Sequence, residues 1–205
     1  MASRRQRLPG TVRRAQIADA ALDIIGRRGL TALTTTSLAS SVGLTSGALF
    51  RHFATREAIL DEAVQRAVAL LAETLPPGDD APLARLRQLA LARVQLLRAQ
   101  PGIAWLLRSE EAALSLPPQG VEQLEGMIRR TQEAIRGAIA EGVRGGEIRT
   151  DIAPSTLQVV FTSTVHALVT PAPGPARPRR PSPNRVVDEL FRMFAPLVTS
   201  PSPRS

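Results

Sequence analysis

Apolar residues recur at steps of three and four positions along nearly the whole chain, a spacing typical of amphipathic helices. Within residues 11–28, the residues that would share one helical face are Val12, Ala15, Ala18, Leu22 and Ile25. Alternating patterns typical of strands are scarce, whereas glycine and proline pairs such as Pro76-Pro77 and Gly145-Gly146 interrupt the helical pattern. The sequence therefore predicts an all-α protein.

These interruptions divide the chain into about nine expected helices. They cover residues 11–28, 34–42, 45–52, 56–75, 82–100, 103–108, 121–142, 154–169 and 183–197. Residues 171–183 contain six prolines, so we expect an extended and exposed Pro-rich loop there. Residues 1–10 are expected to form a disordered basic arm, and residues 199–205 a disordered tail.

Positive charge is concentrated at the N-terminal end of the chain. The net charge is +8, and all 26 basic residues are arginine. Residues 1–56 carry nine arginines against two acidic residues, whereas residues 57–170 carry eleven against fourteen. A one-sided positive charge is typical of proteins that bind polyanions, and a solvated charged arm is the alternative interpretation.

Composition argues against several other classes of protein. The chain has no cysteine and only two histidines, His52 and His166, so we predict no disulfides, no metal site, no cofactor and no catalytic residues. No apolar run reaches the roughly 18 residues of a membrane span, and no long apolar stretch typical of a secretion signal follows the basic N-terminus. We therefore expect a non-enzymatic, cytoplasmic protein with no membrane partner.

Residues 34–60 have the layout of a helix-turn-helix. Ala39 is small enough for a second helix to cross closely, and Gly43 can take the positive φ that the turn needs. Leu44 and Leu49 are placed to fill the angle between the two helices, and Thr45 is placed to cap the second one. This arrangement favours a protein that puts its second helix into the major groove of DNA.

The same region resembles the tetracycline-repressor (TetR) family of bacterial transcription regulators. The matching positions are Ala39, Gly43, Thr45, Gly47, Leu49, Phe50, His52, Phe53, Arg56, Glu57 and Leu60. The resemblance implies a three-helix DNA-binding domain over residues 11–56, which we call the DNA head. A fourth helix from residue 56 would lead into an effector-binding and dimerisation domain over residues 57–198, which we call the body.

The resemblance also implies which residues contact DNA. They are Thr34, Thr45, Ser46, Gly47, Ala48, Phe50, Arg51, His52 and Arg56, with Arg4, Arg5 and Arg7 of the arm. The family commonly has tyrosine where this chain has Phe50, so a phenolic contact to phosphate is missing. Because Gly47 and Ala48 have almost no side chain, we expect base recognition to depend on few contacts and on DNA shape.

Residues of the body could line an effector cavity, although a cavity lining and a core look alike in sequence. The expected effector residues are Leu86, Leu89, Arg93, Leu97, Trp105, Leu124, Met127, Ile128, Phe161, Val165 and His166. Arg93 is expected to extend its guanidinium to solvent or, alternatively, to pair with an acidic group of the effector. We interpret His166 as a core or pocket-wall histidine rather than a metal ligand.

The expected contact between subunits comes from the last two helices, through Val160, Ser163, Thr164, Ala167, Val187, Leu190 and Phe194. The function predicted is that of a homodimeric regulator, a repressor released from a palindromic DNA operator by a small apolar or amphipathic effector. It would be cytoplasmic, and nucleoid-associated when bound to DNA. The alternative is a DNA-binding protein whose body binds another protein and has no small-molecule effector.

Overall fold

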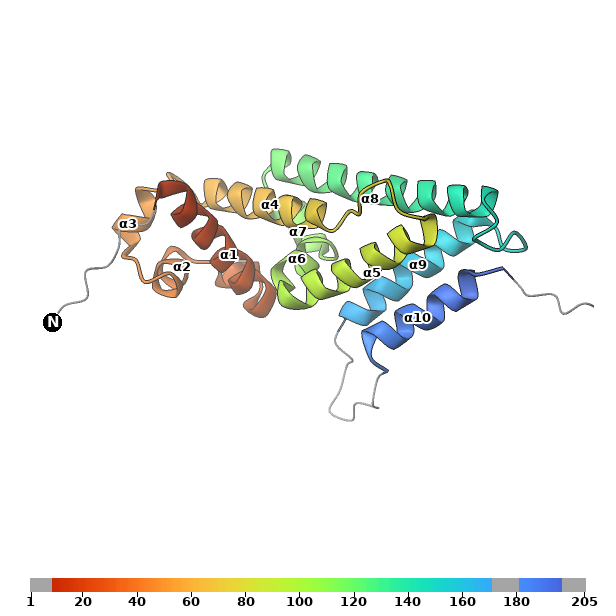
Figure 1. The fold of residues 1–205 in the computed structure, drawn as a ribbon. Helices are drawn as coiled ribbons and strands as arrows, with labels where there is room; N and C mark the ends of the chain where they lie inside the picture. The colour runs from red at the N-terminus through yellow and green to blue at the C-terminus, as the bar shows by residue number, and fades with distance from the viewer. Residues whose placement is uncertain (1–8, 171–180, 197–205) are drawn as a thin grey trace, which may run out of the picture. The chain divides into compact units, whose positions relative to one another are not determined.

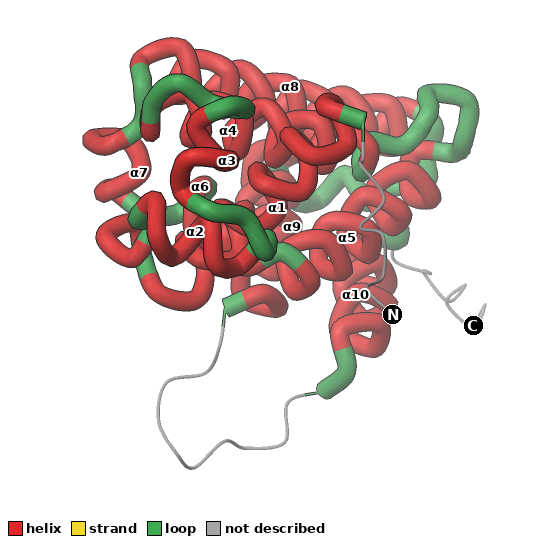
Figure 2. The backbone as a smooth tube through the Cα atoms, turned by 90° about the vertical axis from the view of Figure 1, so that its left-hand side faces the viewer, coloured by secondary structure: helices red, strands yellow, loops and turns green. Residues whose placement is uncertain are grey.

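The computed structural model describes residues 9–170 and 181–196 of the chain. These residues fold into ten α-helices and one 3-10 turn, and no strand occurs among them (Figure 2). The prediction of an all-α fold is confirmed. Residues 1–8 of the expected arm, residues 171–180 of the Pro-rich loop and the expected tail at 199–205 lie outside the described residues.

The N-terminal region contains four helices, α1 (Gly10–Arg28), α2 (Thr35–Ser41), α3 (Ser46–Phe50) and α4 (Arg56–Glu73) (Figure 1). A 3-10 turn, η1 (Leu30–Ala32), follows α1. Gly29 ends α1 with a φ of 80°, a conformation that residues with a Cβ rarely adopt. Glycine at this position therefore explains why the chain can turn sharply toward α2.

The remaining helices are α5 (Pro82–Ala99), α6 (Pro101–Leu106), α7 (Glu110–Ser115), α8 (Pro118–Arg144), α9 (Pro154–Val169) and α10 (Pro183–Phe194). All nine expected helices are present among the described residues, with small shifts at their ends. Helix α7 was not predicted, so the expected number of helices was one too low. This helix has only six residues and begins after Ser109, whose hydroxyl accepts a hydrogen bond from the Ala112 N–H at 3.4 Å.

The chain divides into two compact units. Unit 1 contains the described residues up to Ala72 together with Leu97–Ile128, and unit 2 contains Glu73–Leu96 and the described residues from Arg129 onward. Helices α5 and α8 each contribute residues to both units. The expected DNA head belongs to unit 1, which also includes α6 and α7.

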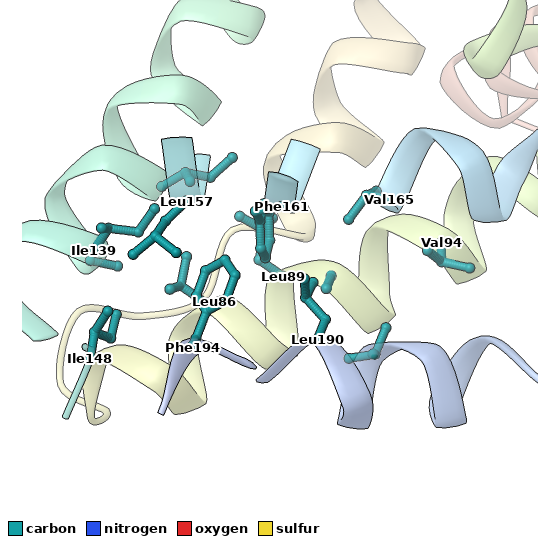
Figure 3. Packing of buried hydrophobic residues seen from close by; sticks show 14 residues of the cluster. Leu86, Leu89, Val94, Ile139, Ile148, Leu157, Phe161, Val165, Leu190 and Phe194 are labelled. Atoms are coloured by element: carbon teal, nitrogen blue, oxygen red, sulfur yellow. The ribbon is translucent and has the colours of Figure 1, made fainter. Parts of the chain in front are cut away.

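Unit 2 is built around one apolar core supplied by α5, α8, α9 and α10 (Figure 3). Leu157, Phe161 and Val165 recur at every fourth position of α9, so they lie on one face of that helix and are all buried. Val187, Leu190 and Phe194 of α10 enter the same core, where each is at most 4% exposed. The two helices therefore bury their apolar faces inside their own chain.

Helices α1 and α6 pack against each other inside unit 1. Their contact passes through two glycines, Gly26 on α1 and Gly102 on α6. Two helices can approach this closely only where side chains are missing, so the glycines determine the spacing of the helices. This contact joins the first helix of the expected DNA head to a helix outside it.

Candidate functional site

The α2-turn-α3 segment has the geometry of a helix-turn-helix. Ala39 on α2 is 2% exposed and Leu49 on α3 is fully buried, so both face the interior of unit 1. Between the helices Gly43 takes a φ of 65°, and the Leu44 N–H donates to the Ala39 carbonyl at 2.9 Å. The roles that the sequence predicts for Ala39, Gly43 and Leu49 in the turn are confirmed.

Side-chain caps hold the N-terminal ends of both helices. The Thr34 hydroxyl accepts from the Ser37 N–H at 3.1 Å, and the Ser37 hydroxyl accepts from the Thr34 N–H at 3.1 Å. The Thr45 hydroxyl accepts from the Ala48 N–H at 3.2 Å. Because α3 has only five residues, this cap stabilises a large share of the helix.

The outer face of α3 carries few large side chains and few polar groups. Ser46, Gly47 and Arg51 are exposed, Ala48 is half-buried, and Phe50 leaves 48% of its surface exposed. A Cβ built on Gly47 meets no atom within 4 Å, so the space above this residue is open. The surface expected to contact DNA is therefore accessible in the single chain.

Arg56 and His52 also have contacts within the protein that the sequence pattern does not indicate. The Arg56 guanidinium donates to the carbonyls of Leu33 and Leu30, at 3.4 Å in each case, and so ties the start of α4 to the segment before α2. The His52 side chain is half-buried, and its carbonyl accepts a hydrogen bond from Arg14. Arg56 remains exposed, so its expected contact with DNA stays a prediction.

Arg14 is the residue of this region whose role the sequence did not reveal. Its guanidinium forms an ion pair with Glu62 of α4, donates to the His52 carbonyl at 2.8 Å, and lies over the Phe53 ring at 4.3 Å from the centroid. The sequence alone shows it only as one of the nine arginines of residues 1–56. In the structure it joins α1 to α4, through Glu62, and to His52, which follows the end of α3.

A second ion pair connects the same two helices, but here the acidic residue lies on α1 and the arginine on α4. The Arg66 guanidinium of α4 donates to the Asp19 carboxylate of α1 at 2.9 Å. Both pairs are partly exposed, so each contributes modestly to stability, but together they fix the register of α1 along α4. The arm residues Arg4, Arg5 and Arg7 lie outside the described residues, and their DNA contacts remain a prediction.

Among the expected effector residues of unit 2, Leu86, Leu89, Phe161 and Val165 lie together in the apolar core. Arg93 directly precedes the core residue Val94 in the sequence. It is only 8% exposed, so its guanidinium does not extend to solvent as first expected. It donates to the Thr131 hydroxyl at 3.3 Å, and burial lowers the pKa of its guanidinium to about 10. Arg93 therefore keeps its positive charge at neutral pH in a buried position.

The expected effector residues in unit 1 differ in how deeply they are buried. Leu97, Leu124 and Met127 are buried, and Trp105 and Ile128 are half-buried. In unit 2, His166 is exposed, which corrects its interpretation as a core or pocket-wall residue. It follows Val165 in α9, so it points about 100° away from the direction in which Val165 enters the core.

The expected subunit contact also needs correction. Val187, Leu190 and Phe194 are buried in the core of their own chain, so they have almost no surface left for a partner. An amphipathic helix shows the same pattern whether its apolar face meets its own core or a second subunit. On α9, Ser163 and Ala167 are exposed, and Val160 and Thr164 are half-buried.

Neither a metal cluster nor a membrane-spanning helix occurs in the described part of the chain. The described residues contain no group of three or more histidine, aspartate or glutamate side chains placed to hold a metal ion. None of the described helices is both long and apolar enough to cross a membrane.

The fold and the exposed α3 face define a DNA-binding protein of the helix-turn-helix class. Residues 17–63 match the model of the bacterial regulatory proteins of the tetR family. The DNA head is therefore similar to the DNA-binding region of this family of transcriptional regulators. The match includes the turn, α3 and the first part of α4, where the Arg56 and Glu62 contacts lie.

Longer similarities extend into the body. The transcriptional repressor KstR2 of Mycobacterium tuberculosis is 25% identical over 143 residues, which cover 68% of this chain and 71% of that protein. The solved structure of that KstR2 has a TM-score of 0.71 at 20% identity and covers 89% of this chain and 95% of its own. The structure of AibR in complex with isovaleryl coenzyme A and operator DNA has a TM-score of 0.71 at 18% identity, covering 89% of this chain and 98% of its own. These structural similarities establish the fold.

Proposed function

We propose that this chain is a homodimeric repressor that binds a palindromic operator and releases it when a small amphipathic effector binds to the body. The observation that carries the proposal is the capped and accessible α3 face, with Ser46, Gly47, Phe50 and Arg51 turned toward solvent. The similarity to the KstR2 repressor supports the direction of regulation. Such a protein acts in the cytoplasm, where bacterial DNA is found.

The proposed effector has an apolar part and an anionic group. Arg93 supports this proposal because a buried guanidinium is stabilised by a negative charge brought into the same low-dielectric surroundings. AibR, which has the same fold, was solved with isovaleryl coenzyme A, a ligand that combines a short acyl chain with phosphates. We therefore infer an acyl acid or its coenzyme A thioester as the class of effector.

Release requires the effector to favour a form of the dimer that binds DNA poorly. Helix α4 is proposed to transmit the effect of the effector to the DNA head, because it begins in the DNA head and ends at Glu73, the first residue of unit 2. The Arg14–Glu62 and Asp19–Arg66 pairs tie α4 to α1, so a displacement of α4 would carry α1 with it. The two recognition helices would then lose the spacing of about one helical turn of DNA that binding to a palindrome needs.

The DNA part of the proposal is tested by selecting fragments of the source genome with the purified protein at physiological salt. We expect one short palindrome to be enriched. Arg51→Ala should weaken binding to it at least about tenfold if the guanidinium contacts a base edge. The matched control is Arg136→Ala, which removes an exposed arginine of α8 in unit 2 and should leave operator binding nearly unchanged. Equal effects of the two variants would contradict the assigned DNA face.

The effector part is tested with the selected operator carrying a fluorescent label. Short acyl acids and their coenzyme A thioesters are added, and release of the operator is followed by anisotropy. We expect at least one acyl compound to release the DNA, and Arg93→Met to raise the concentration needed about tenfold or more. If Arg93→Met responds like the unmodified protein, Arg93 does not hold the anionic group.

A further inference from the structure

Helix α3, the proposed recognition helix, carries a glycine and a phenylalanine one helical turn apart on its outer face. Gly47 and Phe50 are separated by three positions, so their side-chain directions lie on the same side of α3. Phe50 leaves 48% of its surface exposed, whereas the neighbouring Leu49 and Phe53 are buried. The helix thus presents an aromatic ring beside a position that has no side chain.

The folded chain itself does not require glycine at position 47. A Cβ at this position meets no atom within 4 Å, and Gly47 is not among the glycines with positive φ. Glycine is also a poor helix former, so alanine would stabilise α3. The open space above Gly47 is therefore available to a group that comes from outside the chain.

The polar groups available on this face are few. The Thr45 hydroxyl oxygen already accepts from the Ala48 N–H, and Gly47 and Ala48 have no polar side-chain atoms. Between residues 45 and 51 this leaves the Thr45 O–H, Ser46 and Arg51 to form hydrogen bonds with base edges. A phenyl ring can neither donate nor accept a conventional hydrogen bond, so Phe50 must recognise an apolar group.

The major groove offers one apolar group that differs between bases, the 5-methyl of thymine. We propose that Gly47 and Phe50 form an apolar notch that recognises the methyl group of one thymine in each operator half-site. The inference rests on the proposed function, because it takes α3 to lie in the major groove. The ring of Phe50 would contact the methyl from one side, and the missing side chain of Gly47 would leave room for it.

The test removes this methyl group from the DNA. In the palindrome selected by the protein, each thymine is replaced in turn by deoxyuridine, which pairs identically but lacks the methyl. We expect one position per half-site at which the replacement weakens binding about fourfold, the equivalent of the roughly 0.8 kcal/mol from burying one CH₂ group. Losses below about twofold at every thymine would overturn the proposal.

Two variants assign the methyl contact to these residues. Phe50→Ala should weaken binding to the thymine duplex and abolish the difference between thymine and deoxyuridine at that position. Gly47→Ala should weaken binding to the thymine duplex but bind the deoxyuridine duplex at least as well, because the alanine methyl then occupies the space that the thymine methyl has left. Gly47→Ala also improves helix propensity, so a loss of affinity is not explained by unfolding.

Ser46→Ala is the matched control, because it changes an exposed residue of the same helix and should keep the fourfold methyl effect. A methyl effect that persists unchanged in both Phe50→Ala and Gly47→Ala would overturn the notch. Failure of the proposed function gives a different result, since no specific palindrome would then be selected. A selected palindrome without any methyl dependence contradicts the notch alone.

Discussion

Gly26 of α1 and Gly102 of α6 face each other backbone to backbone. A Cβ built on Gly26 would lie 2.2 Å from the Gly102 nitrogen, and a Cβ built on Gly102 would lie 2.0 Å from the Leu22 carbonyl oxygen. Neither backbone can move aside as a flexible side chain could, so any larger residue forces the two helices apart. The first helix of the DNA head and α6 are therefore held at a spacing that only glycine permits.

The first prediction follows from this contact. Gly102→Ala should lower the free energy of unfolding by about 1–3 kcal/mol, because the added methyl overlaps the α1 backbone. The measurement is urea unfolding followed by circular dichroism. Gly137→Ala of α8 is the matched control, since its Cβ meets nothing within 4 Å and should raise stability by about 0.5–1 kcal/mol. Equal effects of the two substitutions would show that α1 and α6 are not in close contact.

The second prediction concerns Arg14. Arg14→Met should lower the free energy of unfolding by about 1 kcal/mol, because it removes the ion pair with Glu62 and the hydrogen bond to His52 together. Arg27→Met removes a more exposed pair with Asp23 and should change stability much less. Arg14→Met should also weaken operator binding, whereas Arg27→Met should not. A stability change no larger than that of Arg27→Met would show that Arg14 does not join these helices.

The helices and the turn could be predicted because local signals agree with the fold. Gly43 takes the positive φ that its place in the turn suggested, and Thr34 and Thr45 cap the helices that follow them. Helix α7 was missed although Ser109, its cap, is a recognisable signal, because six residues are too few for an apolar periodicity. Fold class and helix-turn-helix thus follow from local sequence.

The surroundings of individual side chains could not be predicted in the same way. The pairing of Arg14 with Glu62 joins residues that are 48 positions apart, and no local pattern distinguishes it from a solvated arginine. Burial of Arg93 and exposure of His166 likewise depend on how helices rotate against each other. The apolar face of α10 could meet a second subunit or its own core, and only the fold shows that it meets the core.

The third prediction separates stability from response to the effector. Arg93→Met should raise the free energy of unfolding by about 1–2 kcal/mol, because it replaces a buried charge by an apolar side chain of similar length. The lowered pKa of Arg93 agrees with this expected gain in stability, because the folded state disfavours the charged guanidinium relative to the unfolded chain. Thermal unfolding measures the effect. A variant less stable than the original protein would mean that the guanidinium is well compensated in the free chain.

The fourth prediction concerns the dimer. Because Val187, Leu190 and Phe194 are buried in their own chain, we expect the subunit contact on the exposed face of α9, around Val159, which is 63% exposed. Val159→Asp should convert dimers to monomers in analytical ultracentrifugation, because it buries an unpaired charge in the contact. Leu114→Asp, at an 87% exposed residue of α7, is the matched control and should stay dimeric. A dimeric Val159→Asp variant would place the contact elsewhere.

The most direct test of the whole account is the binding of the purified protein to its selected palindrome and to a scrambled duplex of equal length, measured from low to physiological salt. We expect two chains per palindrome, with an affinity at physiological salt at least about a thousandfold higher than for the scrambled duplex. Equal affinity for both duplexes, falling together as salt rises, would mean that the arginines of the DNA head supply only non-specific attraction. That result would contradict the assignment of this chain as an operator-specific repressor.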